Sequence, residues 1–189
     1  MLKTNKILLY TCCAPCALPI LDYFKNTSEI FNVSLYFFNP NIFSFEEYSR
    51  RLDYVKRIGN IYGVSVLEGE YEHKKWLEYL TENLADDLAS YSENGLRCRF
   101  CFGFRLEEAV IYAKNNGFDG FCSTLQTNLY KDTDYIISEI SSLCDKDGLK
   151  FVDVPLDKKE AYKKGIELCK EFDIYRQKFC GCEFSVNML

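Results

Sequence analysis

The grouping of the cysteines constrains this chain more than any other feature. Six of its ten cysteines form three tight groups that lie far apart in the sequence: Cys12-Cys13, Cys98-x-x-Cys101 and Cys180-Gly181-Cys182. Cysteines that only fill a core show no such grouping, whereas a metal ion or an iron–sulfur cluster needs several thiolates at one point. The grouping therefore indicates a metal-dependent or redox function, whichever fold the chain adopts.

Length and composition favour a single α/β domain over residues 1–189. A hydrophobic fraction of 48% is ample for a core, so a metal is not needed merely to hold the fold together. No stretch approaches the roughly 20 apolar residues of a membrane span, and the N-terminal stretch lacks the features of a signal peptide. We therefore expect a cytoplasmic protein, in which clustered thiols more often bind metal or act in catalysis than form disulfides.

Strands and helices are predicted to alternate along the chain. Ser44-x-x-Glu47 is a capping box, and Gly63 ends the helix that it opens. The strands are expected at 6–11, 33–38, 64–67, 119–124 and 150–154. The helices are expected at about 15–25, 44–62, 73–83, 102–113, 136–143 and 157–172. This alternation predicts a Rossmann-like parallel sheet with helices on both faces.

The first cysteine pair follows the first predicted strand directly. In parallel α/β sheets, ligands bind beyond the carboxyl ends of the strands. Cys12-Cys13 and Ser123-Thr124 both stand at such ends. We therefore expect a cysteine-rich metal site at the carboxyl ends of the strands.

Two of the cysteine pairs supply the four thiolates that a [4Fe–4S] cluster needs: Cys12 with Cys13, and Cys98 with Cys101. Adjacent cysteines can reach two irons of one cube. The second pair lies at a predicted helix start, where the positive end of the helix dipole favours thiolate. The arginines on either side of Cys98 would also stabilise a negatively charged cluster.

Cys180 and Cys182 are left over by this assignment. They could form a strained disulfide, bind a second metal or replace one of the four cluster ligands. The main alternative is a structural zinc site made by Cys98, Cys101, Cys180 and Cys182, although the pattern lacks the paired symmetry of a zinc ribbon.

A second alternative is a thioredoxin-type redox motif at Cys13-Ala-Pro-Cys16, between a strand and a helix. No βα unit precedes this strand, and the alternative leaves Cys12, Cys98 and Cys101 unexplained. The lone cysteines at 122, 144 and 169 are expected to be buried core residues.

The net charge of −5 argues mildly against a large nucleic-acid footprint. The candidate basic patches are Arg50-Arg51 with Lys56-Arg57, and Lys74-Lys75, for which a solvated helix face is the more common role. The only histidine, His73, is expected at the surface. Aromatic rings at 36, 37, 38 and 43 are expected to lie mostly in the core, with a few free to stack on an unpaired RNA base.

Several motifs, taken in order over residues 6–185, resemble the QueH-type epoxyqueuosine reductases. The strings are Cys12-Cys13-Ala14-Pro15, 36–42, Glu46-Glu47-Tyr48-x-x-Arg51, Gly69-Glu70-Tyr71, Arg97-Cys98-x-x-Cys101, Ser123-Thr124-Leu125 and 175–182. The resemblance implies reduction of the epoxide of epoxyqueuosine, at the wobble position of a tRNA anticodon, to give queuosine. It also implies a [4Fe–4S] cluster, an additional iron close by and an electron donor, which we expect to be ferredoxin-like.

The resemblance also implies roles for individual cysteines. Cys12, Cys13, Cys98 and Cys101 would hold the cluster. Cys180 and Cys182 would be a redox-active catalytic pair or would contribute to the second metal. Cys16 stands where some members of the family have Asp, so the ligand set of the second iron is expected to include Cys16 here. A metal-binding RNA module without catalysis is the competing class.

Overall fold

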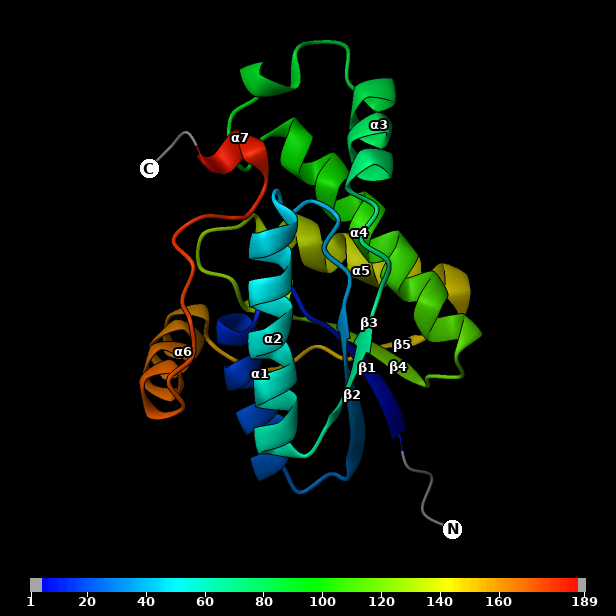
Figure 1. Cartoon of the computed structure of the whole chain (residues 1–189). Coiled ribbons are helices and arrows are strands. Elements are labelled where there is room, and N and C mark those ends of the chain that lie inside the picture. The colour runs from blue at the N-terminus through cyan, green and yellow to red at the C-terminus, as the bar shows by residue number, and fades with distance from the viewer. Residues whose placement is uncertain (1–4, 187–189) are drawn as a thin grey trace.

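A five-stranded sheet in which all strands are parallel forms the centre of the computed structural model, which describes residues 5–186 (Figure 1). The strands are β1 (Asn5–Tyr10), β2 (Phe31–Phe37), β3 (Ser65–Glu68), β4 (Gly120–Ser123) and β5 (Lys150–Phe151). Their order in the sheet is β3-β2-β1-β4-β5. This order confirms the predicted Rossmann-like fold, and it places the reversal of strand order between β1 and β4.

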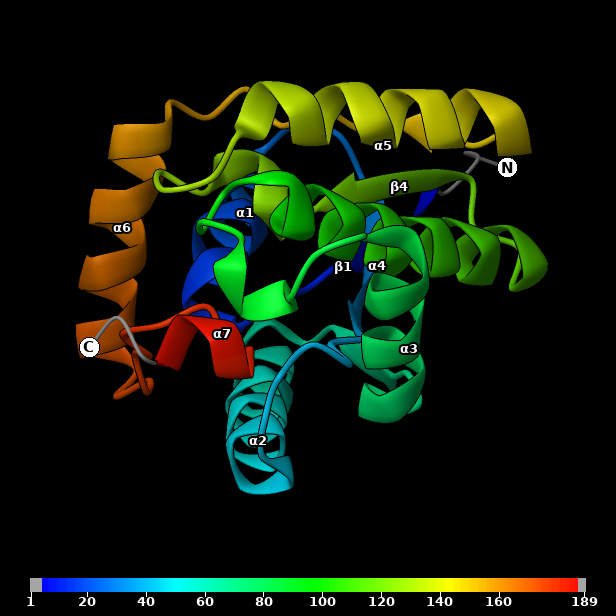
Figure 2. The same ribbon diagram turned by 90° about the horizontal axis from the view of Figure 1, so that it is seen from above.

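Helices cover both faces of the sheet, as predicted. They are α1 (Ala14–Asn26), α2 (Phe45–Tyr62), α3 (His73–Asn83), α4 (Leu96–Asn115), α5 (Thr133–Asp147), α6 (Lys158–Glu171) and α7 (Glu183–Val186), with short 3-10 helices η1 (Leu88–Ser90) and η2 (Thr124–Thr127). Figures 1 and 2 show α2 and α5 on opposite sides of the sheet. None of the helices within residues 5–186 combines the length and the apolar character that a membrane crossing requires.

Two hydrophobic cores result from this arrangement. One core joins β1 and β2 to α1, α2 and α6. The other joins the sheet to α3, α4 and α5, and it includes Cys101 and Cys182. Because β1 is covered on both faces, its residues Ile7, Leu8 and Leu9 are almost completely buried. The site described below therefore rests on a rigid central strand.

Local sequence signals account for where α2 begins and ends. The Ser44 side chain accepts a hydrogen bond from the Glu47 backbone N–H at 3.3 Å, and Gly63 ends the helix in the left-handed conformation with φ +67°. The predicted Ser44 cap is thus confirmed, whereas the Glu47 carboxylate pairs with Arg51 at 2.7 Å. The helix α4 begins at Leu96, so that Cys98 and Cys101 lie in its first two turns, as expected.

Three predictions about individual side chains are settled by burial. The rings of Tyr36, Phe37 and Phe38 are buried, whereas that of Phe43 is half exposed. The lone cysteines at 122, 144 and 169 are buried, as predicted.

His73 was predicted at the surface, but its side chain is only 19% exposed. Its Nδ1 lies 2.7 Å from the Pro40 carbonyl oxygen and its Nε2 lies 3.3 Å from Glu183 Oε1, so the ring links β2's loop to α7.

Candidate metal centre

The first cysteine of the site lies where β1 and β4 end side by side. Tyr10 pairs with Ser123 in the sheet register, so the residues that follow meet at the point of strand reversal. The Cys12 backbone N–H donates to Thr124 Oγ1 at 3.0 Å, and the Thr124 hydroxyl in turn donates to Cys12 Sγ at 3.2 Å. Two neighbouring strands thus fix this sulfur at the switch point, where parallel α/β folds bind their ligands.

Three thiols gather at the start of α1. Cys13 is the N-cap residue of α1 and Cys16 belongs to its first turn. Their sulfur atoms and that of Cys12 all lie within 4.8 Å of one another. This trio, Cys12, Cys13 and Cys16, supplies the soft donors that iron–sulfur clusters, zinc and Cu(I) prefer.

The pKa values of the three thiols are shifted in different directions. Hydrogen bonds from Cys13 and Cys16, and then from Thr124, hold the pKa of Cys12 well below its ordinary value. The hydrogen bond to Cys12 raises the pKa of Cys13 to about 12, and the same kind of contact raises that of Cys16. Of the three thiols, Cys12 therefore gives up its proton most readily, and the thiolate is the form that binds a metal.

Lys131 brings a positive charge to the cysteines, because its ammonium nitrogen lies 3.5 Å from Cys180 Sγ. Burial alone would lower the pKa of Lys131, but thiolate charge at Cys180, and also at Cys12 and Cys98, outweighs that effect and raises it. The lysine also lies over the ring of Phe102, at 4.9 Å. The positive charge of Lys131 thus stands among cysteines of three distant segments.

Arg105 is a second cation at the site and is only 2% exposed. Its guanidinium donates to the Tyr10 hydroxyl at 2.7 Å, to Asn39 Oδ1 at 2.8 Å and, more weakly, to Cys101 Sγ at 3.7 Å. Within residues 5–186 no carboxylate forms an ion pair with it. A buried charge requires a partner, and the atoms available to Arg105 are hydroxyl, amide and sulfur.

Arg51 holds the C-terminal cysteines in place. Its guanidinium pairs with Glu47 at 2.7 Å and donates to the carbonyl oxygens of Cys180 at 2.7 Å and Phe179 at 3.3 Å. The strap, which we define as residues 173–182, runs from the end of α6 to α7 (Figure 1). Arg51 was a member of a candidate basic patch, but its side chain is buried by the ion pair and the strap, so it does not belong to an exposed patch.

The other candidate basic residues lie on helix faces, beside carboxylates. Arg50 and Lys75 pair with glutamates three or four residues away in their own segments, and Lys56 pairs with Glu68. Arg57 and Lys74 have acidic neighbours as well. These five residues therefore have the role that was expected to be the more common one: they lie on solvated helix faces.

A glycine with positive φ separates the last two cysteines. Gly181 has φ +124°, and a Cβ there would lie 3.0 Å from an Arg51 nitrogen and 3.1 Å from Ile42. Burial raises the pKa of Cys182 to about 12. All ten cysteines, which fall within the described residues, are free thiols.

A cavity of about 860 Å³ opens onto these groups. The residues of the metal centre that line it are Cys12, Cys13, Cys16, Cys180, Arg105 and Lys131. Cys98, Cys101 and Cys182 do not line the cavity and belong to, or pack against, the adjoining core. The volume of the cavity falls in the range of sites that bind a small molecule or a single nucleotide.

Sequence reasoning missed two residues of this site. Arg105 stands four positions after Cys101, and that spacing places both on one face of a helix, so a signal existed. Lys131 lies in an irregular loop, and nothing in its sequence neighbourhood indicates where its ammonium group points.

The fold and the thiols define the class of protein: a Rossmann-like α/β protein with a cysteine-rich centre at its switch point. The family model described as "Epoxyqueuosine reductase QueH" matches residues 7–188. The chain belongs to this family and is an oxidoreductase.

Curated relatives match over almost the whole chain. Epoxyqueuosine reductase QueH of Staphylococcus epidermidis is 33% identical over 186 residues, which cover 95% of this chain and 76% of the relative. The protein of the same name from Thermotoga maritima is 31% identical over 180 residues, which cover 95% of this chain and 90% of the relative.

A solved structure supports the fold assignment. The U34-tRNA thiolase NcsA from Methanococcus maripaludis, determined with its [4Fe–4S] cluster, superposes with a TM-score of 0.54 over 94% of this chain and 59% of that chain. The two sequences are 17% identical, so the likeness concerns the fold alone.

Proposed function

We propose that this protein reduces the epoxide of epoxyqueuosine in tRNA to give queuosine, with a [4Fe–4S] cluster held by Cys12, Cys13, Cys98 and Cys101. Membership of the epoxyqueuosine reductase family supports the reaction. The observation that carries the proposal is the convergence of thiols from distant segments on one cavity at the switch point. That a tRNA thiolase with a [4Fe–4S] cluster has a similar fold is consistent with this reading.

The surrounding charges fit such a group. A cluster bound by thiolates is an anion in a site shielded from water. Arg105 and Lys131 bring two positive charges to the cysteines, and neither forms an ion pair with a carboxylate of residues 5–186. A zinc ion held by four thiolates would carry the same net charge as an oxidised cubane cluster held by four thiolates. The two cations therefore fit an anionic metal–thiolate group, and the choice of the cluster over zinc rests on membership of the family.

When bound, the cluster would supply electrons singly, and a second iron would act as a Lewis acid on the epoxide oxygen. The overall change consumes two electrons and two protons and releases water. We propose Cys16, Cys180 and Cys182 as the thiols available to the second iron, or Cys180 and Cys182 as a redox-active pair. The electrons come from an external donor, which we propose to be ferredoxin-like.

Residues of the chain prepare the cavity for this reaction. Lys131 Nζ keeps a positive charge beside Cys180, where negative charge on an opening epoxide would be stabilised. Thr124 fixes the sulfur of Cys12 through two hydrogen bonds. Arg51 holds the backbone of Cys180 and so sets where that thiol faces the cavity.

Metal analysis of the anaerobically purified protein tests the proposal. We expect about four sulfides and four or five irons per chain, as a cubane cluster with or without an extra iron requires. Cys12→Ser and Cys98→Ser should lose most of the iron, whereas Cys144→Ser, a buried cysteine of α5, should keep it. Zinc without sulfide would contradict the proposal, as would full iron retention in both ligand variants.

A turnover assay tests the reaction itself. Epoxyqueuosine-containing tRNA and dithionite should yield queuosine with the intact protein. The double variant Cys180→Ser, Cys182→Ser separates two roles: loss of iron identifies ligands, and a retained cluster without turnover identifies a redox pair. Full activity of the double variant would exclude both roles.

The close approach of Cys13 and Cys16 favours one alternative, a general thiol oxidoreductase. Reduction of insulin disulfides that is abolished by Cys16→Ser would support it.

We further propose that residues 1–189 form a single domain and that it works in the cytoplasm, since ten free cysteines suit a reducing compartment.

A further inference from the structure

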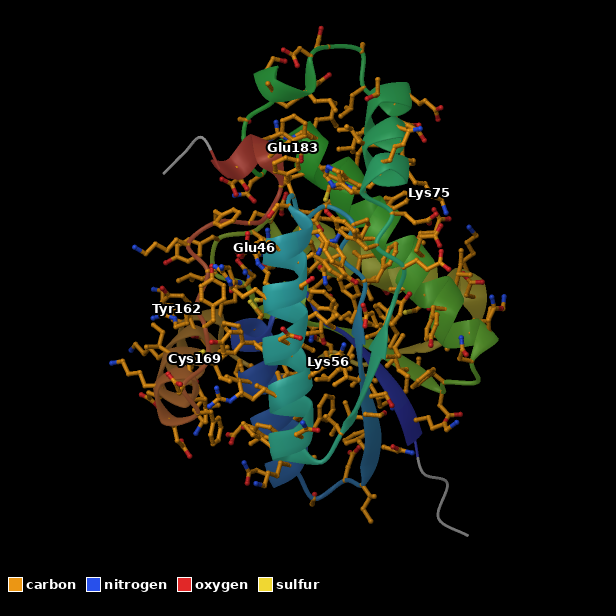
Figure 3. All side chains as sticks on the ribbon, in the orientation of Figure 1. Glu46, Lys56, Lys75, Tyr162, Cys169 and Glu183 are labelled. Carbon is orange, nitrogen blue, oxygen red and sulfur yellow. The ribbon has the colours of Figure 1, made fainter. Side chains whose placement is uncertain are left out.

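Two tyrosines stand at the rim of the cavity. Tyr130, in the loop after η2, is 65% exposed, and Tyr162, on α6, is 37% exposed. Figure 3 labels Tyr162 on α6. Eight large hydrophobic residues are exposed among those that the structure describes, and only these two line the cavity. Their rings meet edge to face, with centroids 5.7 Å apart and planes at 88°.

The backbone of Tyr130 is held on both sides. Its carbonyl oxygen accepts a hydrogen bond from Asn94 Nδ2 at 2.7 Å, and its N–H donates to Asn128 Oδ1 at 3.0 Å. The next residue, Lys131, reaches inward to Cys180. An exposed ring thus stands on a fixed backbone, one residue from a side chain of the metal centre. Such a ring loses little conformational freedom when a ligand packs on it.

Positive charge accompanies the two rings. Arg176 and Lys178 lie in the strap, are exposed and line the same cavity. Neither forms an ion pair with any other residue of 5–186. Tyr130, Tyr162 and these two cations thus line one cavity. Aromatic rings beside unpaired cations form the kind of surface that binds single-stranded nucleic acid, with rings for bases and cations for phosphates.

We propose that Tyr130 stacks on the purine-like base of the substrate nucleotide and that Tyr162 braces the ring of Tyr130 from its edge. The inference rests on the proposed function. The epoxide is part of a substituent on that base. When this substituent extends into the cavity towards Cys12 and Cys180, the base itself lies nearer to the rim of the cavity, where Tyr130 stands. Arg176 and Lys178 then face the phosphates on either side of the base.

A binding assay without chemistry tests this inference. The probe is an anticodon stem–loop RNA with 2-aminopurine at the wobble position, because stacking on an aromatic ring quenches its fluorescence. With the cluster-loaded protein we expect quenching on binding. Tyr130→Ala should abolish the quenching and weaken binding about 5- to 100-fold, the range that one base–aromatic stack provides. Tyr130→Trp should preserve both, and Tyr162→Ala should have the smaller effect.

Phe45→Ala is the matched control, because Phe45 is also 65% exposed but does not line the cavity. It should bind the RNA and quench as the unchanged protein does. If Tyr130→Ala binds and quenches like the unchanged protein, the stacking role is refuted, while epoxide turnover by the unchanged protein would leave the proposed function intact. If the unchanged protein neither binds the RNA nor reduces the modified tRNA, both proposals fail together.

Discussion

Arg105→Met probes the buried cation of the metal centre most directly. Methionine matches the length and apolar character of the arginine stem but removes the guanidinium. The hydrogen bonds to the Tyr10 hydroxyl at 2.7 Å and to Asn39 Oδ1 at 2.8 Å are lost. A hydrogen bond that involves a charged group contributes about 1.5–3 kcal/mol.

The net destabilisation is smaller than the sum of the two bonds. The Tyr10 hydroxyl still donates to the Phe38 carbonyl oxygen at 2.9 Å, and it lies 3.3 Å from Asn39 Oδ1. The Tyr10 hydroxyl and the Asn39 amide, which both lose the guanidinium, thus keep a polar neighbour. Folding of the variant also no longer requires the desolvation of a buried cation. We therefore expect the variant to be less stable by about 2–4 kcal/mol.

Urea unfolding of the reduced, metal-free protein measures this difference. With a denaturant slope of about 2 kcal/mol/M, the midpoint should fall by roughly 1–2 M. The control is Arg99→Met on the same helix, because the Arg99 side chain is 49% exposed and pairs with Asp132 at the surface. That variant should lose less than about 1 kcal/mol.

Equal midpoints for the two variants would refute the reasoning, since the buried network would then contribute no more than a surface ion pair. A double-mutant cycle with Tyr10→Phe isolates the contact itself. Residues in one hydrogen-bond network couple by about 0.5–3 kcal/mol. A coupling near zero would show that Arg105 acts through some other neighbour.

Three further outcomes are expected. Gly181→Ala should lower the free energy of unfolding by about 1–3 kcal/mol, which is more than Gly117→Ala should. Both glycines have positive φ, but only a Cβ added at Gly181 would meet neighbouring atoms. Equal losses in thermal unfolding would contradict this. Thr124→Val should reduce iron retention because Cys12 loses two hydrogen bonds, while Thr124→Ser should restore it; iron per chain decides. Arg51→Met should cost about 3 kcal/mol in urea unfolding because the buried Glu47 carboxylate loses its short ion pair and keeps only the half-exposed Arg50 at 3.6 Å, and adding Glu47→Gln should recover part of the loss; no recovery would argue against the pair.

Sequence reasoning predicted the parallel sheet because its signals are local. Apolar runs, the Ser44 capping box and Gly63 each act within a few residues. The position of Cys12-Cys13 at a strand end was also predictable, since it follows from that alternation alone. The same local logic placed Cys98 and Cys101 at a helix start.

The charges around the cysteines could not be predicted in this way. Arg51 and its neighbour Arg50 look alike in the sequence, but one is buried under the strap and the other is half exposed beside glutamates. What separates them is a contact with Cys180, about 130 positions away. Lys131 likewise acquires its role only when the strap is in place. Long-range packing, which no short pattern encodes, decides which cations serve the site.

The gathering of thiols from three parts of the chain has a consequence for how the protein is made. Cys12, Cys13 and Cys16 meet within one helical turn, so a short nascent segment already brings them together. Cys180 and Cys182 are synthesised about 80 residues after Cys101, and in the folded protein the backbone of Cys180 is held by Arg51. The trio consists of soft donors, which thiophilic ions prefer. If the proposed ligand set is correct, a cofactor delivered after release of the chain would meet all of its ligands, whereas one delivered earlier would meet only the trio.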